Sequence, residues 1–489
     1  MKRSLVVLGV VGALVTASLL LGSGGVINVL STNTVNNNGL SSHRWEPSSS
    51  SGSLTWVTGF TEIDPGFSRI ESYVSAWSGG NWLPQIALRP PNNFPTGDVY
   101  LEWDSVRSRF VFVVIDLVGP RLNVWYGDST NASGTSWVFR STAVFAATGS
   151  VGWDFPSVGV DGSGRIIVGA VQIPGDSGFY TRVSTDGGAT FSAASKVPAV
   201  PGLGQIKGPR SRVVATNNQF HAFIPTLQSS TPFLPTAVER FQSANGTSWS
   251  GPSTVASFGA PLNNSTNTFC GGQGCGRLFY APLVDARGFP NGRWSMAIQI
   301  NNGGFNNVLL CTSDRGCGIA NSWPSDQFMA GTAVDANGGY WIGYDTYSSG
   351  LSVPLITQAI YLPPGQTAIG ATTNTGIDPT TWILRPDRCP TACFAAGDYA
   401  GVGANPFAAA STPFVRQSGL LTDLRQSFVQ DPAGKPNVPN FVPNFIPFEL
   451  GTDVSHLARP VPPDAFGLPP EETRGVLPVS LLDSQGGVE

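Results

Sequence analysis

One short pattern recurs along the chain and constrains its fold more than any other feature. The segment Ser184–Phe191 reads S-T-D-G-G-A-T-F and fits the pattern S-x-D-x-G-x-T-aromatic at every fixed position. Such a segment caps a β-hairpin, because the Asp side chain accepts hydrogen bonds from turn amides and a glycine tolerates a left-handed backbone. Looser copies occur at five other places, the last at Thr372–Gly376. The aromatic residues that close the six copies are Trp82, Trp137, Phe191, Trp249, Trp323 and Trp382.

A second marker runs in phase with the first. The turn that begins at Asp161 has the form D-x-x-G and precedes the apolar run Arg165–Ala170. Runs that are rich in aromatic and β-branched residues favour strands. No window combines helical periodicity with capping residues, so the predicted class is all-β. Comparable turns begin at Asp104, Asn217, Asp285 and Asp335, ahead of strands predicted at 109–115, 220–224, 294–300 and 340–344.

The spacing of the repeats predicts a ring of sheets. Consecutive closing aromatic residues lie 54 to 74 residues apart, and a four-stranded propeller blade needs roughly 40–50 residues. Six repeats therefore predict a six-bladed β-propeller over residues 53–425. A seven-bladed ring is the alternative, if residues 27–70 or 395–425 supply another sheet. The Ser- and Asn-rich residues 26–52 are predicted to be a linker, and the Pro-rich residues 426–489 an extended tail.

The N-terminus has the composition of an export signal. Met1-Lys2-Arg3 precedes a 17-residue, mostly apolar run from Leu5 to Leu21, so residues 1–25 are predicted to direct export. The run is at the lower limit for crossing a bilayer, and no clear Ala-x-Ala site follows it. A cleaved signal and a retained membrane anchor both remain open. The protein is therefore expected to be secreted or attached to the cell surface.

The cysteines and the charges exclude several kinds of site. An even number of cysteines in an exported chain favours disulfides, and their spacings fit zinc knuckles poorly. With three histidines in 489 residues, neither a metal nor another cofactor is expected. Charged residues are 12% of the chain, and no basic cluster offers a surface to nucleic acid. The expected pairs are Cys270 with Cys275, Cys311 with Cys317, and Cys389 with Cys393.

The repeats resemble those of the sialidase-like, or Asp-box, β-propellers. The segment Phe394–Gly401 looks like a Gly-Asp-Tyr segment of exported bacterial members, and Asp154-Phe-Pro156 ahead of Val158–Asp161 looks like their strand start. The resemblance implies a glycan or another cell-surface ligand, bound by an exo-glycosidase of the sialidase type or by a glycan-binding protein. In this family the boxes lie on the outer rim, away from any active site. A non-catalytic envelope scaffold is the alternative function.

The chain departs from the sialidases at their arginine motif. Sialidases of this fold grip a carboxylate with three arginines and use an Asp as acid/base and a Tyr assisted by Glu as nucleophile. Their first arginine lies in an Arg-Ile-Pro motif. The nearest matches here are Arg69-Ile70-Glu71 and Leu88-Arg89-Pro90, so Arg89 is the substrate-binding candidate that the resemblance supplies.

The remaining candidates follow from propeller geometry. The innermost strands of the blades begin at one mouth of the central channel, and residues at those starts converge there. A pair of carboxylates there acts as acid and as base or nucleophile when their environments separate their pKa values. Alternatively, these residues cap strands or form ion pairs in a wet channel. The catalytic candidates are Asp98, Asp154, Asp326 and, by resemblance, Asp398 and Tyr399; the substrate-binding candidates from the strand starts are Arg210, Arg212, Arg277 and Tyr280.

Overall fold

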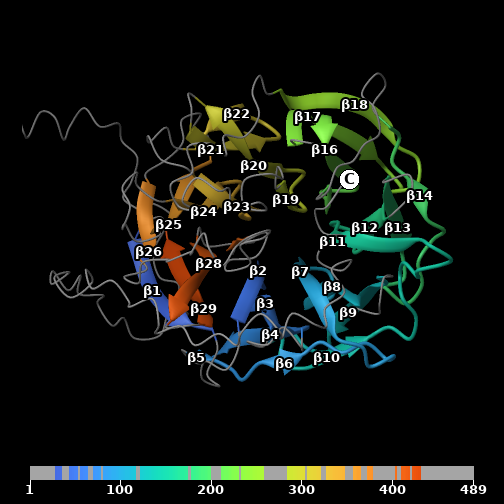
Figure 1. Cartoon of the computed structure of the whole chain (residues 1–489), viewed down its shortest axis with the longest axis horizontal. Coiled ribbons are helices and arrows are strands. Elements are labelled where there is room, and N and C mark those ends of the chain that lie inside the picture. Colours follow the sequence, from blue (N-terminus) through green and yellow to red (C-terminus); the bar gives the residue numbers. More distant parts are fainter. Residues whose placement is uncertain are drawn as a thin grey trace, which may run out of the picture.

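The chain forms a ring of antiparallel sheets in which the described residues contain strands and turns and no helix (Figure 1). The computed structural model describes residues 28–35, 43–52, 55–63, 70–78, 81–116, 122–173, 178–199, 211–230, 233–257, 284–302, 305–320, 327–346, 356–364, 372–377, 402–404, 409–418 and 421–430. The first three sheets comprise β2 (His43–Ser51), β3 (Trp56–Ile63), β4 (Ile70–Ser78), β5 (Asn81–Trp82) and β6 (Ile86–Ala87); β7 (Thr96–Asp104), β8 (Arg109–Asp116), β9 (Val124–Ser129) and β10 (Trp137–Phe139); and β11 (Gly152–Val160), β12 (Ile166–Ile173), β13 (Phe179–Ser184) and β14 (Ser195–Lys196).

Four further sheets complete the ring. The next three comprise β15 (Arg212–Ala215), β16 (Phe220–Ser230), β17 (Phe233–Ser243) and β18 (Ser250–Ser257); β19 (Asp285–Gly288), β20 (Trp294–Asn302), β21 (Phe305–Thr312) and β22 (Gly316–Ile319); and β23 (Gln327–Val334), β24 (Tyr340–Thr346), β25 (Ile356–Leu362) and β26 (Thr372–Ile377). The last sheet joins both ends of the described chain, as β27 (Gly403–Ala404), β28 (Ala409–Ser418), β29 (Leu421–Gln430) and β1 (Asn28–Thr34). The innermost strands β2, β7, β11, β15, β19, β23 and β27 contact one another in this order around the ring.

The predicted all-β propeller is confirmed, and each of the six repeats forms one sheet. A seventh sheet, formed by β27, β28, β29 and β1, stands beside the six sheets of the repeats, as the seven-bladed alternative predicted. The repeat markers could not reveal it, because its residues carry no box and its outermost strand comes from the opposite end of the chain. The prediction of a linker over residues 26–52 is wrong where β1 and β2 lie. Strand β29 also continues to Gln430, beyond the predicted start of the tail at residue 426.

Most of the predicted markers occupy hairpin turns. In the best-fitting box, the side chain of Asp186 accepts hydrogen bonds from the backbone N of Thr190 (2.9 Å) and from the hydroxyls of Ser184 (2.7 Å) and Thr190 (2.6 Å). Gly188 has a φ of +85°, and a Cβ added there would lie 2.3 Å from a carbon of the Tyr126 ring in the neighbouring sheet. A glycine is therefore required at this position.

Two predicted turns are wrong. The residues Thr372–Gly376, predicted as the sixth box, lie in strand β26 and pair with β25. The segment that begins at Asp285 is strand β19, and the turn follows it at 289–292. In both cases the polar residues resemble a turn sequence, but pairing with a neighbouring strand decides their conformation.

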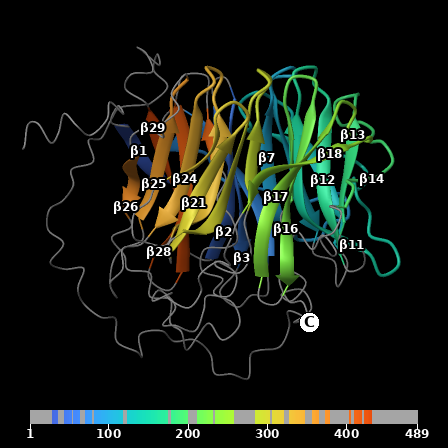
Figure 2. The same ribbon diagram turned by 90° about the horizontal axis from the view of Figure 1, so that it is seen from above.

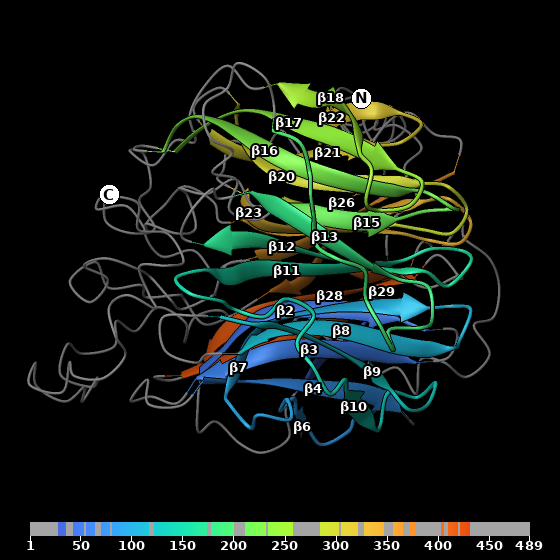
Figure 3. The same cartoon turned by 90° about the vertical axis from the view of Figure 1, so that its right-hand side faces the viewer.

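The strand order defines two faces of the ring. Each sheet of the six repeats starts at its innermost strand, and four antiparallel strands return the chain to the face where it began. The end where the innermost strands start is called the upstream mouth. The opposite end, which carries the box turns of the third and fourth strands, is called the box face (Figures 2 and 3).

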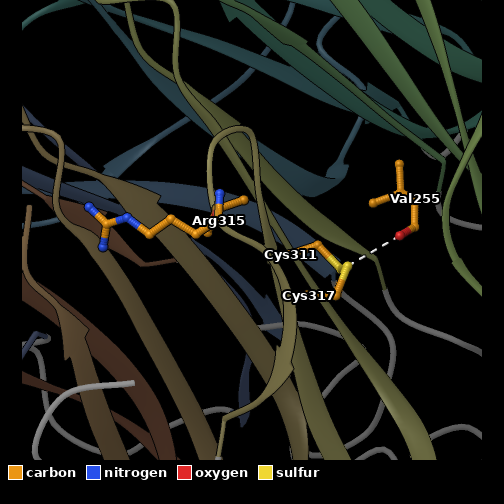
Figure 4. Close-up of a disulfide and its surroundings, with 5 residues drawn as sticks. Val255, Cys311, Arg315 and Cys317 are labelled. Carbon is orange, nitrogen blue, oxygen red and sulfur yellow. Dashed lines mark hydrogen bonds between the residues drawn. A yellow bond between two sulfur atoms is a disulfide. The ribbon is translucent and has the colours of Figure 1, made fainter. Parts of the chain in front are cut away.

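One of the predicted disulfides lies within the described residues. Cys311 and Cys317 are register partners on β21 and β22 and form a disulfide at the fifth box (Figure 4). The sulfur of Cys317 also lies 3.2 Å from the carbonyl oxygen of Val255 on β18 of the preceding sheet. This prediction is confirmed, and the disulfide lies on the box face. The other two predicted pairs, Cys270 with Cys275 and Cys389 with Cys393, lie outside the described residues.

Candidate ligand site in the central channel

Four innermost strands are interrupted by a bulge near the upstream mouth. In each case the irregularity falls at the third to fifth residue of the strand, where two residues lie opposite a single residue of the neighbouring strand. Bulges at matched places re-aim side chains and are common beside active sites. The four bulges lie between Trp45 and Ser48, Gly97 and Tyr100, Asp154 and Ser157, and Phe328 and Gly331.

Two of the bulges contain a non-glycine residue with a left-handed backbone. Asp98 and Phe155 occupy equivalent positions in β7 and β11, and both have a φ of +50°. Such a conformation costs about 1–3 kcal/mol for a residue with a side chain, and it persists where the surroundings impose it. The ring therefore maintains a strained backbone at the upstream mouth of two neighbouring blades.

The structure brings three of the predicted residues onto the channel wall. Asp98, Asp154 and Arg212 lie on β7, β11 and β15, the innermost strands of three successive blades. Their relative exposures are 6%, 0% and 3%, so all three are buried. One carboxylate oxygen of Asp154 accepts a hydrogen bond from the backbone N of Phe155 at 2.7 Å. Burying three charged groups is costly unless other polar groups compensate them.

The two aspartates lie at strand starts, as the sequence predicted, but not at equivalent positions of their strands. Asp98 is equivalent to Phe155, whereas Asp154 is equivalent to Gly97. The difference of one residue lies within the bulge, because the sequence does not show which residue of the strand is left unpaired. The two carboxylates therefore leave their strands at different heights in the channel.

Arg89 lies on the connection that leads into β7 rather than on an innermost strand. Its guanidinium is hydrogen-bonded to the buried carboxylate of Glu71 on β4, and Tyr73 donates a second hydrogen bond to Glu71 at 2.8 Å. The hydrogen bond and the charge of Glu71 raise the pKa of Arg89. Since Arg89 is about half exposed (48%), the pair holds a partly accessible cation near the upstream mouth.

The other predicted site residues lie outside the described residues; they are Arg210, Arg277, Tyr280, Asp326, Asp398 and Tyr399. The catalytic pair that is placed is thus Asp98 and Asp154.

The sequence prediction missed a polar network that crosses the channel. Arg287 on β19 donates hydrogen bonds to the carbonyl oxygen of Leu101 (2.6 Å) and to the carboxylate of Glu102 (3.2 Å), both on β7. Its second terminal nitrogen lies 3.4 Å from the hydroxyl of Ser48 and from the carbonyl oxygen of Ser49 on β2. A single arginine therefore joins the second and fifth sheets of the ring and also reaches the first.

Tyr100 lies at the centre of this network. Its ring faces the guanidinium of Arg287 at 4.2 Å and that of Arg212 at 5.0 Å. Its hydroxyl is within hydrogen-bonding distance of the carboxylate of Asp285 (3.2 Å) and of the carbonyl oxygen of Ala286 (3.0 Å). Cation–π contacts to a buried ring are stronger than those at an exposed one. Tyr100 therefore links the predicted site residue Arg212 to the network of Arg287.

The charges of this network depend on one another. Burial raises the pKa of Tyr100 and that of Glu102, and the positive charge of Arg287 opposes both shifts. Burial by itself lowers the pKa of Arg287, but Tyr100, Glu102 and Asp285 together hold it above its usual value. Arg287 thus remains a cation at any physiological pH, which makes it the group that compensates the buried acids.

A small cavity lies beside the network, toward the box face. Its volume is about 40 Å³, which is enough for roughly three water molecules. The downstream halves of five innermost strands surround it, and Glu102 and Arg287 contribute its charged groups. The other lining residues are Ser49, Ser50, Ser51, Gly288, Phe289, Ala333, Val334, Val402 and Ala404.

The spacing of some of these residues in the sequence indicates that they share a face of a strand. Asp285 and Arg287 are two residues apart, as are Tyr100 and Glu102, and this spacing places each pair on one face of a strand. The pair Asp285 and Arg287 was not recognised, because Asp285–Gly288 was predicted to be a turn. The contact of Arg287 with Tyr100 joins residues that are 187 positions apart, so no local pattern could reveal it.

His221 takes no part in the channel. It is 3% exposed on β16, and its Nε2 lies 3.2 Å from the hydroxyl of Thr216. Burial, followed by the charge of Arg240, lowers the pKa of His221 to about 3.

The buried histidine predicts a pH dependence of stability. Between pH 6.5 and 3 the unfolded chain binds a proton at this histidine that the folded chain excludes, so the free energy of unfolding should fall as the pH falls. The variant His221→Gln should show a flatter dependence between pH 6.5 and about 5, above the range in which carboxyl groups titrate. Urea unfolding at several pH values measures this. Parallel curves for the two proteins would contradict the assignment of a neutral, buried His221.

The described residues contain neither a cluster of metal ligands nor a membrane-spanning helix. No group of three or more His, Cys, Asp or Glu side chains in the described ranges could hold a metal ion. Within the same part of the chain, no helix is long and apolar enough to cross a membrane. The predicted export segment at residues 1–25 lies outside the described residues.

The chain resembles several solved structures at low identity. A protein of unknown function from Dyadobacter fermentans is 11% identical and aligns with a TM-score of 0.44, over 83% of this chain and 99% of that one. An ulvan lyase from a new family of polysaccharide lyases is 10% identical, with a TM-score of 0.45 over 81% and 95% of the two chains. An α-L-arabinanase from Penicillium chrysogenum is 12% identical, with a TM-score of 0.41 over 70% and 96%. No protein-family model matches the chain, and no curated protein matches it.

Proposed function

We propose that this chain is an exported, glycan-directed propeller that binds a sugar at the upstream mouth of its channel. The observation that carries the proposal is the placement of charge. In a chain with only 12% charged residues, the innermost strands β7, β11 and β15 carry the buried charged residues Asp98, Asp154 and Arg212 near the upstream mouth. Polar groups that converge in a concave channel are typical of ligand sites.

The residue types suit a polyhydroxylated ligand. The carboxylates of Asp98 and Asp154 accept hydrogen bonds from sugar hydroxyls, and the guanidinium of Arg212 donates hydrogen bonds in a fixed planar arrangement. Several solved structures of similar architecture bear the names of enzymes that act on arabinan or ulvan. A glycan is the ligand class for which we propose this mouth.

We further propose that the site is that of an exo-glycosidase, with Asp98 and Asp154 as the catalytic pair. One carboxylic acid would donate a proton to the glycosidic oxygen as the bond to the leaving sugar breaks. The other carboxylate would act as base or nucleophile, and water would supply the hydroxyl group of the product. In the sialidase-type form of this reaction, Arg212 would grip the carboxylate of an acidic sugar, with Arg89 at the edge of the mouth.

The proposal is tested by assaying the purified protein on a panel of aryl glycosides. The panel includes sialosides and arabinosides. Hydrolysis of at least one substrate is expected, and Asp154→Asn should reduce kcat/KM by a factor of about 10²–10⁴, the usual contribution of a positioned acid or base. The matched control is Asp314→Asn, which makes the same change at a carboxylate on the box face that is 37% exposed.

The controls separate catalysis from binding. Equal losses in both variants would indicate general damage to the ring and would count against Asp154 as a catalytic residue. Binding without turnover would support a glycan-binding protein and contradict the proposal of glycosidase activity. If the panel is neither hydrolysed nor bound, the glycan-directed function is wrong and the propeller is better regarded as an interaction scaffold.

A further inference from the structure

A closed loop at the upstream mouth joins the first sheet of the ring to the second. Residues 88–96 connect β6 to β7, and Ser72, near the start of β4, holds the two ends of this connection together. The backbone N of Leu88 donates to the carbonyl oxygen of Ser72 at 2.8 Å, and the hydroxyl of Thr96 donates to the carbonyl oxygen of Leu88 at 2.7 Å. The same hydroxyl accepts a hydrogen bond from the backbone N of Ser72 at 3.2 Å. This segment, called the 88–96 loop, is therefore fixed at both ends where β4 and β7 begin.

The tip of the 88–96 loop is braced by further hydrogen bonds. The side chain of Asn92 donates to the carboxylate of Asp116 at the end of β8 (2.8 Å) and accepts from the backbone N of Phe94 (3.2 Å). Asn93 has a φ of +60°, and its backbone N donates to the carbonyl oxygen of Pro90 at 2.8 Å. Three prolines fix further φ angles of the loop. A loop that is already ordered loses little conformational entropy when a ligand binds.

Phe94 is exposed on this braced tip. Among the described residues three large hydrophobic side chains are exposed, and Phe94, at 41%, is the aromatic one. The other two, Val106 and Val138, lie on the box face. An aromatic ring offers a flat apolar surface of the kind that lines many ligand sites. The C–H face of a sugar ring is apolar and packs well on such a surface.

Arg89 adds a polar group to the same loop. It is 48% exposed, and its Nε and Nη2 donate hydrogen bonds to the buried carboxylate of Glu71. The structure shows no further hydrogen bond from Arg89 to a described residue, so its Nη1 is available to donate to a ligand. Because Glu71 compensates the positive charge, the pair suits a neutral acceptor such as a sugar hydroxyl.

The loop tip lies close to the proposed site along the chain. Phe94 precedes Asp98 by four residues, and an extended chain advances at most 3.3–3.6 Å per residue, so their Cα atoms lie within about 14 Å of each other. A short oligosaccharide spans this distance. A sugar bound beside Asp98 can therefore carry a neighbouring sugar that reaches the 88–96 loop.

We propose, on the basis of the glycan-directed function above, that the 88–96 loop forms a second sugar subsite at the upstream mouth. Phe94 stacks on the apolar face of the neighbouring sugar, and Arg89 donates a hydrogen bond to one of its hydroxyls. The ligand is then a chain of two or more sugars, and the loop determines the preference for chain length.

The experiment measures how the affinity of the full-length protein depends on chain length. The probes are an array of glycans of one to four units, built from arabinose, xylose, galactose, mannose, glucuronic acid and sialic acid. Isothermal titration calorimetry then compares the one- and three-unit forms of the glycans that bind. The variants are Phe94→Ala and Phe94→Trp, and the matched control is Val106→Ala, which truncates a side chain that is 51% exposed on the box face.

The unmodified chain is expected to bind a three-unit glycan more tightly than its single sugar. Phe94→Ala should weaken binding of the three-unit form by about tenfold or more, as the loss of an aromatic anchor does, and should leave the single sugar unaffected. Phe94→Trp should keep the preference for length, and Val106→Ala should bind as the unmodified chain does.

Two results would overturn the subsite and leave the glycan-directed function intact. The first is unchanged binding of the three-unit form by Phe94→Ala, and the second is an equal loss for both lengths in that variant. If the folded, unmodified chain binds no glycan of the array, the proposed function and the subsite that rests on it are both wrong.

Discussion

A chain that lacks residues 1–34 is expected to lose several kcal/mol of stability, whereas a chain that lacks only residues 1–27 is expected to keep it. The difference between the two deletions is strand β1, which forms six register pairs with β29. A backbone hydrogen bond contributes about 0.5–1.5 kcal/mol net, so the loss of this strand, with about one hydrogen bond per pair, should cost about 3–9 kcal/mol. It also leaves the edge of β29 unpaired, and such an edge favours association between chains.

Urea unfolding measures this difference, and size-exclusion chromatography measures the association. The deletion of residues 1–27 is the matched control, since it removes the apolar run but keeps every described residue. Equal midpoints for the two deletions would show that β1 does not close the ring. A lower midpoint only for the longer deletion, together with larger species in chromatography, is the expected result.

The variant Arg287→Met should be destabilised by about 3–5 kcal/mol, the usual cost of breaking a buried ion pair by the removal of one partner. The loss leaves Glu102 without its compensating cation and removes the guanidinium from the ring of Tyr100. The double variant Arg287→Met, Glu102→Gln should recover part of the loss, because it removes the uncompensated carboxylate as well.

The pH dependence of Arg287→Met distinguishes this cause from a packing defect. Burial already raises the pKa of Glu102, and without Arg287 the pKa rises further. A raised carboxyl pKa stabilises the fold at low pH, and this stability is lost as the pH rises through the folded-state pKa. The single variant should therefore lose stability between about pH 4 and neutrality relative to the double variant. Parallel curves for the two variants would contradict the role of Arg287.

The fold could be predicted from local patterns because each repeat is a local unit. The box at Ser184–Phe191 and the apolar run after Asp161 both describe a hairpin, and the other sheets of the repeats follow by analogy. The seventh sheet could not be found in this way. Pairing between β1 and β29 joins residues about 390 positions apart, and only closure of the ring explains why a Ser- and Asn-rich segment becomes a strand.

The candidate site was predictable in part. Asp98 and Asp154 were expected at the starts of innermost strands and Arg212 as a cation of the next blade, and the structure puts the three on successive innermost strands. The heights of Asp98 and Asp154 differ because a bulge adds residues that counting does not reveal. Arg287 and Tyr100 were missed because their contact spans the channel, where neither periodicity nor a short motif brings them together.

Glycan-array binding of the intact protein tests the central claim, that the charged upstream mouth is the functional site, most directly. The unmodified chain is expected to bind at least one class of glycan, and Asp154→Asn and Arg212→Met are each expected to abolish the binding. The control Asp314→Asn on the box face should bind as the unmodified chain does. Binding that survives both changes in the channel, or no binding by the folded protein to any glycan, would contradict the account.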